Sequence, residues 1–182
     1  MYSDGSEAEF GVGCTFCVFE SLDITRIWSS RLSNKNTVFQ AEIIALRELI
    51  KFSKNFNTDQ VIKIHVNNTA VIQAVFNLKK TNKIAREIST ILLDNSNIEI
   101  ISIKAHNGYK GKEGTDTLAK QATENGIPYT YIQIPRCFFK GLLEYLLLDK
   151  WQNEWTEDVT GRDIYNLIPK IKCAWNHGEE RK

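Results

Sequence analysis

The sequence predicts an α/β fold: a five-stranded mixed sheet with helices on both faces, followed by a helical extension. Two observations favour this class. The first 32 residues contain three strand-like runs joined by short polar or glycine-containing links, which is typical of an antiparallel meander. From residue 37 onward, helical and strand-like patterns alternate, which indicates parallel strands joined by helices that pack on the sheet.

The strands of the meander are predicted from the stretches YSDGS (2–6), GVGCTFCVFES (11–21) and ITRIWSSRL (24–32). Residues 37–55 then carry apolar side chains at helical spacing and predict the first helix. The β-branched run VIKIHV (61–66) predicts a fourth strand. The stretch NTAVIQAV that follows predicts a short helix whose N-terminal cap is Asn67 or Asn68.

Three further elements complete the predicted sheet domain: a helix at 82–95, a strand at 98–105 and a helix at 114–126. Glycine and proline after the last helix place the domain boundary, with a sheet domain over 1–127 and an extension over 128–182. The extension predicts a long amphipathic helix, with an apolar side formed by Phe139, Leu142, Leu143, Leu146, Leu147, Trp151 and Trp155.

The overall composition gives no indication of a membrane protein or a secreted protein. The net charge is +1, so bulk charge does not indicate a nucleic-acid partner. No apolar run approaches the ~20 residues of a membrane helix. The N-terminus also shows no secretory leader pattern. We expect an intracellular protein, nuclear or cytoplasmic, with no membrane partner.

Basic residues nevertheless gather locally. The first group, called the basic cluster below, consists of Lys79, Lys80, Lys83 and Arg86, and a second group consists of Lys104, Lys110 and Lys112. Groups of this size are usually solvated surface, yet lysine and arginine are also the residues that contact phosphates. Both interpretations fit the sequence.

Two cysteines form a C-x-x-C spacing, which is typical of redox sites and of half a zinc site. Cys14 and Cys17 both lie inside a predicted strand, where an offset of three residues places them on opposite faces. No second close pair completes a metal cage. The sequence therefore predicts buried free thiols.

Three acidic residues stand at the predicted ends of elements. Asp4 ends the first strand, Glu42 lies in the first turns of the first helix, and Asp116 opens the last helix. The first and fourth strands are expected to be parallel neighbours, which brings Asp4 beside Asn67. Clustered carboxylates repel one another unless a cation holds them, so the pattern predicts a site for a hard divalent ion. Singly, each acid is also explained by a turn or a helix start.

Four stretches follow one another over residues 1–125 at characteristic spacing: YSDGS (2–6), VFQAEIIAL (38–46), IHVNNTAVIQAV (64–75) and AHNGYKGKEGTDTLAK (105–120). Together they resemble the type 1 ribonuclease H domains of non-LTR retrotransposon polyproteins. The segment WQNEWTEDVTGRDIYNLIP (151–169) is similar to the region after this domain in arthropod-type elements. The resemblance implies a ribonuclease H-like fold, with the reverse transcriptase domain of a parent polyprotein as a partner.

The resemblance also implies an activity: endonucleolytic hydrolysis of the RNA strand of an RNA/DNA hybrid, with two Mg²⁺ or Mn²⁺ ions. One ion activates water and the other stabilises the departing 3′ oxygen. By position in the family pattern, Asp4 bridges both ions, Glu42 serves the leaving-group ion, and Asp116 holds the ion of the attacking water. His106 assists proton transfer or product release.

Hybrid recognition is expected to depend on the backbone and the 2′-hydroxyl groups. Gly5 and Ser6 bring backbone amides close to the sugar edge. Thr37 either contacts a DNA phosphate or caps the first helix. The basic cluster, Lys79, Lys80, Lys83 and Arg86, adds affinity that depends on salt and not on sequence.

The pattern fails at one metal-binding position, because Asn67 stands where the family has an aspartate. An amide oxygen can coordinate a hard cation but brings no charge. Lys112 and Thr115 depart from the family's usual asparagine and alanine. Two hypotheses follow: a ribonuclease whose activity is impaired by Asn67, or an inactive module that binds hybrids or a partner protein.

Overall fold

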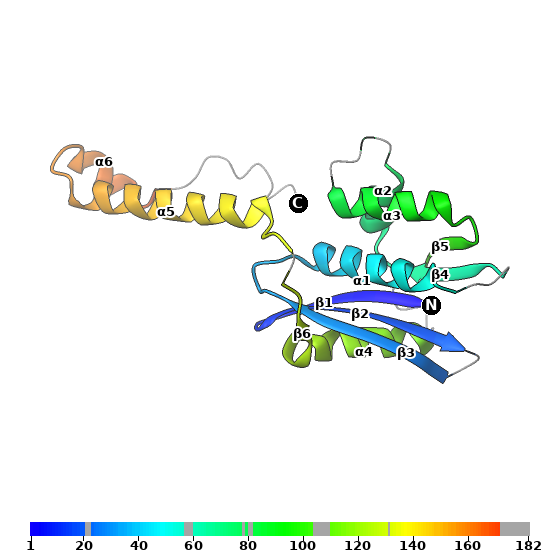
Figure 1. Ribbon diagram of the computed structural model, residues 1–182. Coiled ribbons are helices and arrows are strands. Elements are labelled where there is room, and N and C mark those ends of the chain that lie inside the picture. The colour runs from blue at the N-terminus through cyan, green and yellow to red at the C-terminus, as the bar shows by residue number, and fades with distance from the viewer. Residues whose placement is uncertain are drawn as a thin grey trace. The chain divides into compact units, whose positions relative to one another are not determined.

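The computed structural model describes residues 1–20, 23–56, 60–77, 79, 82–103, 110–130 and 132–171. The chain forms two compact units, Met1–Ile134 and Pro135–Lys182, so the first unit extends beyond the predicted boundary at residue 127. The first unit contains the whole described sheet, and the second contains two described helices (Figure 1).

The first unit begins with the predicted meander, β1 (Tyr2–Ala8), β2 (Gly11–Glu20) and β3 (Asp23–Leu32). The remaining elements are α1 (Val38–Ser53), β4 (Ile62–Val66), α2 (Thr69–Phe76), α3 (Lys83–Asp94), β5 (Ile98–Ser102), α4 (Lys110–Asn125) and β6 (Ile127–Pro128). The predicted order of strands and helices is confirmed through α4.

The sheet has the order β5-β4-β1-β2-β3-β6. Its meander strands are antiparallel, β4 is parallel to β1, and β5 is parallel to β4, as predicted. The sixth strand was not predicted. It is two residues long and pairs in parallel with β3 through Ser30 and Arg31, so it is too short to carry a periodic pattern.

Helices pack on both faces of the sheet, because side chains of a strand alternate between faces. Cys14 of β2 packs with Ala41 and Ala45 of α1. Its neighbour Gly13 faces α4, where an added Cβ would lie 2.0 Å from the Ala119 carbonyl oxygen. Figure 1 shows α1 and α4 on opposite sides of the meander strands.

The two cysteines of the C-x-x-C spacing are free and buried, as predicted. Cys14 lies on the face covered by α1, whereas the Thr115 side chain of α4 acts on the thiol of Cys17 and opposes the rise in its pKa that burial causes. Burial raises the pKa of the Cys14 thiol to about 12, so the thiol stays protonated and acts as a small apolar group.

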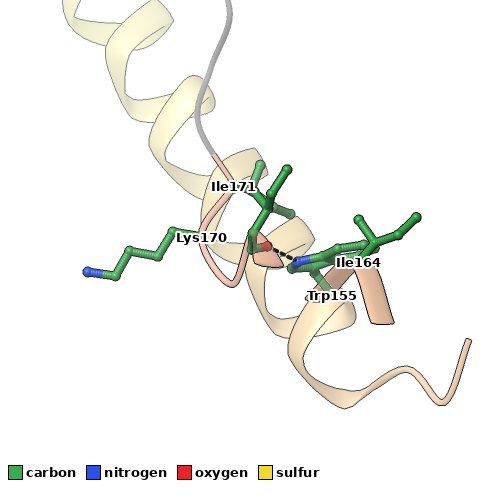
Figure 2. Close-up of a pocket in the computed structure, with 5 residues that line it drawn as sticks. Trp155, Ile164, Lys170 and Ile171 are labelled. Carbon is green, nitrogen blue, oxygen red and sulfur yellow. Dashed lines mark hydrogen bonds between the residues drawn. The ribbon is translucent and has the colours of Figure 1, made fainter. Parts of the chain in front are cut away.

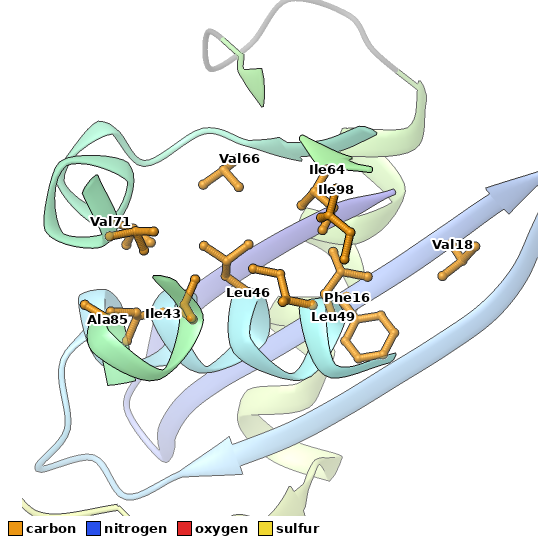
Figure 3. Close-up of a cluster of buried hydrophobic side chains, with 13 residues drawn as sticks. Phe16, Val18, Ile43, Leu46, Leu49, Ile64, Val66, Val71, Ala85 and Ile98 are labelled. Atoms are coloured by element: carbon orange, nitrogen blue, oxygen red, sulfur yellow. The ribbon is translucent and has the colours of Figure 1, made fainter. Parts of the chain in front are cut away.

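The main hydrophobic core lies between the sheet and the helices α1 to α3. Leu46 and Leu49 of α1 meet strand residues such as Phe16 and Ile64, and Val71 joins them from α2 (Figure 3). This packing fixes α1 and α2 against the central strands. It therefore holds the start of α1 and the end of β4 in place beside β1.

The second unit contains α5 (Arg136–Glu157) and α6 (Arg162–Leu167), so the predicted long helix is confirmed. The indole of Trp155 donates a hydrogen bond of 3.0 Å to the Ile168 carbonyl, which ties the segment after α6 to α5 (Figure 2). A cavity of about 530 Å³ lies there, lined in part by Ile164 and Ile171. Within this unit no α5 side chain is buried. None of the helices described is long and apolar enough to cross a membrane.

Candidate active site

Asp4 is the central residue of the site. The residue is 4% exposed, and the Gly5 amide donates a 3.0 Å hydrogen bond to its Oδ1. The prediction that Asp4 ends the first strand is wrong, since β1 continues to Ala8. Pairing of Ser6 and the following residues with β2 outweighs the local turn preference of Asp-Gly-Ser.

Asn67 follows β4 and lies beside Asp4, as predicted. Its Nδ2 donates to Asp4 Oδ1 at 3.4 Å, because β4 runs parallel to β1 and brings their corresponding ends together. A second carboxylate at this position would repel Asp4 in the absence of a cation. The Asn67 amide supplies a hydrogen-bond donor to Asp4 instead.

The cap of α2 is Asn68 and not Asn67. Asn68 Oδ1 accepts hydrogen bonds from the amides of Ala70 and Val71, at 2.9 and 3.2 Å. Its side chain also lowers the pKa of Glu42, which burial raises. The alternative left open by the sequence is thereby resolved: one asparagine caps the helix, and the other faces the acidic site.

Glu42 approaches β1 closely from the first turns of α1. Glu42 is 8% exposed, and a Cβ added to Gly5 would lie 2.8 Å from its Cγ. Only a residue without a side chain leaves this space free. Thr37 and Gln40 form a capping box that fixes the start of α1, with Thr37 Oγ1 accepting from the Gln40 amide at 3.3 Å.

Burial and mutual repulsion shape the electrostatics of this pair. Burial, followed by the charge of Asp4, raises the pKa of Glu42 to about 7. Burial is likewise the main cause that raises the pKa of Asp4, and the charge of Asp116 adds to it. Lys112 opposes these effects and lowers the pKa of both carboxyl groups.

Asp116 lies further along its helix than predicted. Because α4 begins at Lys110, Asp116 is in the second turn and does not open the helix. Gly111 does not interrupt α4, since it packs against the Tyr2 ring where a Cβ would come within 2.5 Å. Lys120, one turn later, donates a 2.7 Å hydrogen bond to the Asp116 carboxylate and forms an ion pair with it.

The family resemblance of the sequence implies divalent ions at this site. No group of three or more His, Cys, Asp or Glu side chains is close enough to hold a metal ion in the part of the chain that the structure describes. However, Glu42 Oε2 and Asn67 Oδ1 are both buried and have no hydrogen-bond partner among the described residues. Two unpartnered oxygens beside the Asp4 carboxylate form an all-oxygen donor set, which fits a hard cation.

The residues predicted to bind nucleic acid lie on β1, at the start of α1 and around α3. Ser6 lies on β1 next to Gly5, and Thr37 is the cap of α1. The basic cluster is exposed where described, at Lys79, Lys83 and Arg86. Lys80 and His106 lie outside the described residues, as does Lys104 of the second basic group.

Sequence reasoning missed two residues that contact the site acids. One is Asn68 on Glu42, for which the sequence offers no separate signal beyond the cap itself. The other is Lys120, whose spacing of four residues from Asp116 on a helix was a usable signal.

Comparison with known proteins agrees with this fold. A foamy viral protease–reverse transcriptase in complex with an RNA/DNA hybrid is 25% identical, with a TM-score of 0.52 over 68% of this chain; this chain spans only 19% of the viral one. The foamy viral protein in complex with double-stranded DNA is 26% identical, with a TM-score of 0.53, and 92% of that chain is covered. No curated protein sequence matches this chain.

Ribonuclease H1 of Halobacterium salinarum shares the fold at 17% identity and a TM-score of 0.50, over 69% of this chain and 96% of the archaeal one. The RNase H family profile itself matches residues 1–124. This match spans β1 to α4 and includes Asp4, Glu42, Asn67 and Asp116. The chain belongs to the RNase H family.

Proposed function

We propose that the first unit hydrolyses the RNA strand of RNA/DNA hybrids, with an activity lowered by Asn67. The observation that carries the proposal is the buried Asp4–Glu42 pair, which has unpartnered oxygens of Glu42 and Asn67 beside it. Family membership supports the reaction class. A related viral protein is known in complex with an RNA/DNA hybrid, which supports the substrate class.

Asp4, Glu42 and the Asn67 amide oxygen, together with Asp116, are the residues that would hold two Mg²⁺ or Mn²⁺ ions. When bound, such ions supply Lewis-acid activation of water and charge stabilisation at the leaving 3′ oxygen. The protein's own contribution is to hold these oxygens in a buried setting. We assign His106 to proton transfer or product release.

The hybrid is proposed to bind through its backbone and 2′-hydroxyls. Gly5 and Ser6 lie on β1 next to Asp4, and we assign them to the sugar edge nearest the site on the basis of this position. The exposed Lys83 and Arg86, three residues apart on α3, share one side of that helix and supply phosphate contacts together with Lys79 and Lys80.

The test is restoration of the missing charge. We expect Asn67→Asp to raise the rate of hybrid cleavage by at least about tenfold in Mg²⁺ and Mn²⁺, since one electrostatic group at a reaction centre is commonly worth ~10²–10³ in rate. The measurement is single-turnover cleavage of a labelled RNA/DNA duplex. Asp4→Asn is the matched control, and it should abolish cleavage in both backgrounds.

Equal cleavage rates for the original chain and Asn67→Asp would contradict a metal-binding role for position 67. Cleavage that is absent from both, with hybrid binding retained, would favour the second candidate, an inactive hybrid-binding or protein-interaction module. The hydrogen bond from Asn67 to Asp4 favours that candidate, because it ties up a carboxylate oxygen that a metal ion needs.

We also propose a context for the unit: the ribonuclease H part of a non-LTR retrotransposon reverse transcriptase, acting inside the cell, nuclear or cytoplasmic. The similarity to a reverse transcriptase of foamy virus supports an association with reverse transcription. The reverse transcriptase domain of such a polyprotein is then the expected protein partner.

A further inference from the structure

One side of helix α5 carries a matching pattern in both directions from Leu147. Leu143 and Trp151 lie four residues before and after Leu147, and Lys140 and Glu154 lie seven residues before and after it. At 3.6 residues per turn, all of them lie within about 40° of Leu147 around the helix axis. These five residues, called the central face below, have an apolar centre with a positive charge at one end and a negative charge at the other.

The central face is open to solvent. Leu143, Leu147 and Trp151 are 60%, 48% and 50% exposed, and no α5 side chain is buried by the residues that the structure describes. The segment after α6 hydrogen-bonds to Gln152 and Trp155, which lie outside the central face. The contacts within this unit therefore leave the apolar centre of the face uncovered.

The charged ends of the central face have only weak partners on their own helix. Lys140 forms an ion pair with Glu144 at 3.6 Å, and Glu154 forms one with Lys150 at 3.7 Å. Both pairs are largely exposed, and exposed pairs one turn apart add little to stability. The Lys140 and Glu154 side chains remain accessible to a partner of opposite charge.

The ends of α5 also carry charges opposite to those that the helix dipole favours. Arg136 begins the helix, where the dipole favours acids, and Glu157 ends it, where the dipole favours bases. A second α5 that runs antiparallel would place its acidic end beside Arg136 and its basic end beside Glu157. Both the side-chain charges and the two dipoles would then attract.

We propose that the central face binds the central face of a second copy of this chain, with the two α5 helices antiparallel about a twofold axis at Leu147. Leu147 then meets the partner's Leu147, and Leu143 meets the partner's Trp151, a residue type that often anchors interfaces. Lys140 faces the partner's Glu154. The twofold axis makes each unlike contact twice. Dimerisation through α5 is independent of the catalytic role proposed for the first unit.

Charge selects the antiparallel direction. A parallel pair in register would place Lys140 on the partner's Lys140 and Glu154 on the partner's Glu154, and like charges would repel at both ends. In the antiparallel pair, the same residues attract at both ends. The face is therefore complementary to itself in one direction only.

Sedimentation velocity of the full chain, from about 1 to 100 μM, measures the oligomeric state. The original chain should form a dimer within this range. Leu147→Glu should abolish it, since twofold symmetry brings the two introduced carboxylates together. Tyr145→Glu is the matched control, because Tyr145 is 65% exposed on the opposite side of α5 and should not affect the dimer. Circular dichroism should show the same helix content in both variants.

Charge reversal tests the direction of the pair. Lys140→Glu and Glu154→Lys should each weaken dimerisation by about tenfold, since each creates two like-charged contacts in the dimer. The double variant returns opposite charges across an antiparallel interface and should recover the original affinity. It repairs neither Lys140–Glu144 nor Lys150–Glu154, so the recovery can come only from contacts between copies.

Three results would overturn the proposal. One is a full chain that stays monomeric throughout this concentration range. Another is a dimer that Leu147→Glu and Tyr145→Glu affect equally, because its interface would then lie elsewhere. The third is a double charge variant that dimerises no better than the two single variants.

Discussion

At the residue scale, the site depends on where each amide and carboxyl group lies. The sequence predicted that Asp4 and Asn67 would be neighbours, because parallel adjacent strands bring corresponding ends together. The sequence could not decide whether Asn67 or Asn68 caps α2, since asparagine is a good capping residue at either position. That choice depends on the path of the backbone after β4, which tertiary packing sets.

Glu42 makes the stability of the metal-free chain depend on pH. The folded chain keeps this proton up to about pH 7, whereas the unfolded chain releases it near the ordinary value of 4.5. Between these values the folded state binds more protons, so the free energy of unfolding falls as pH rises. The slope is at most about 1.4 kcal/mol per pH unit for this group.

Denaturant titrations between pH 4.5 and 8 in EDTA check this prediction. Glu42→Gln should remove the Glu42 part of the slope and leave a flatter profile. Glu48→Gln is the matched control on the same helix, outside the acidic site. If the original chain and Glu42→Gln had parallel profiles, the raised pKa of Glu42 would be refuted.

At the element scale, the residue before α1 had two possible roles, one in capping the helix and one in binding nucleic acid. Thr37 was expected either to cap this helix or to contact a phosphate. The structure gives it the capping role, with the Gln40 side chain accepting in return from the Thr37 amide at 3.1 Å. A phosphate contact is compatible with this role but is not needed to explain the residue.

Thr37→Ala should therefore lower the free energy of unfolding by about 1 kcal/mol, since it removes the acceptor for the Gln40 amide. Thr37→Ser keeps the hydroxyl and should be close to the original chain. Chemical denaturation measures both. Hybrid affinity at fixed salt, measured on the same proteins, should be unchanged if capping is the whole role. A weaker affinity of Thr37→Ala with unchanged stability would reverse the assignment.

Element boundaries were the weakest part of the prediction, and the errors have physical causes. Apolar residues three or four positions apart predicted α1 clearly. Helix α4, in contrast, begins four residues earlier than predicted, at Lys110 and not at Gly114. Gly111 and Gly114 both lower the helix propensity of this stretch. In the folded chain Gly111 is favoured there, because the Tyr2 ring leaves no room for a side chain.

At the scale of the whole molecule, the first unit continues past its family match. Residues 127–129 and 133 contact β3 and α1. The Tyr129 amide donates to the Arg31 carbonyl at 2.8 Å, and the Gln40 side chain donates to the Gln133 carbonyl at 3.0 Å. Tyr129 also hydrogen-bonds through its hydroxyl with Arg47 and Glu48. These contacts join segments that are far apart in the sequence, so no local sequence pattern could predict them.

Truncations test this boundary. A chain that ends at Ile134 should keep the thermal midpoint of the first unit. A chain that ends at Gly126 loses β6 and the Tyr129 contacts, and should melt lower by about 5 °C or more. Calorimetry of both truncations and of the full chain measures the difference. Equal midpoints would show that residues 127–134 add no stability.

The hydrogen bond between Asn67 and Asp4 implies a trade-off between stability and activity. The two side chains, asparagine and aspartate, have nearly the same shape, so position 67 accepts either without repacking of the core. The amide removes a repulsion and adds a donor, which stabilises the metal-free fold. The carboxylate that strengthens metal binding would restore the repulsion. A charge at position 67 that favours cleavage would thus destabilise the metal-free fold, and either protonation of a carboxyl group or a bound metal ion would relieve that cost.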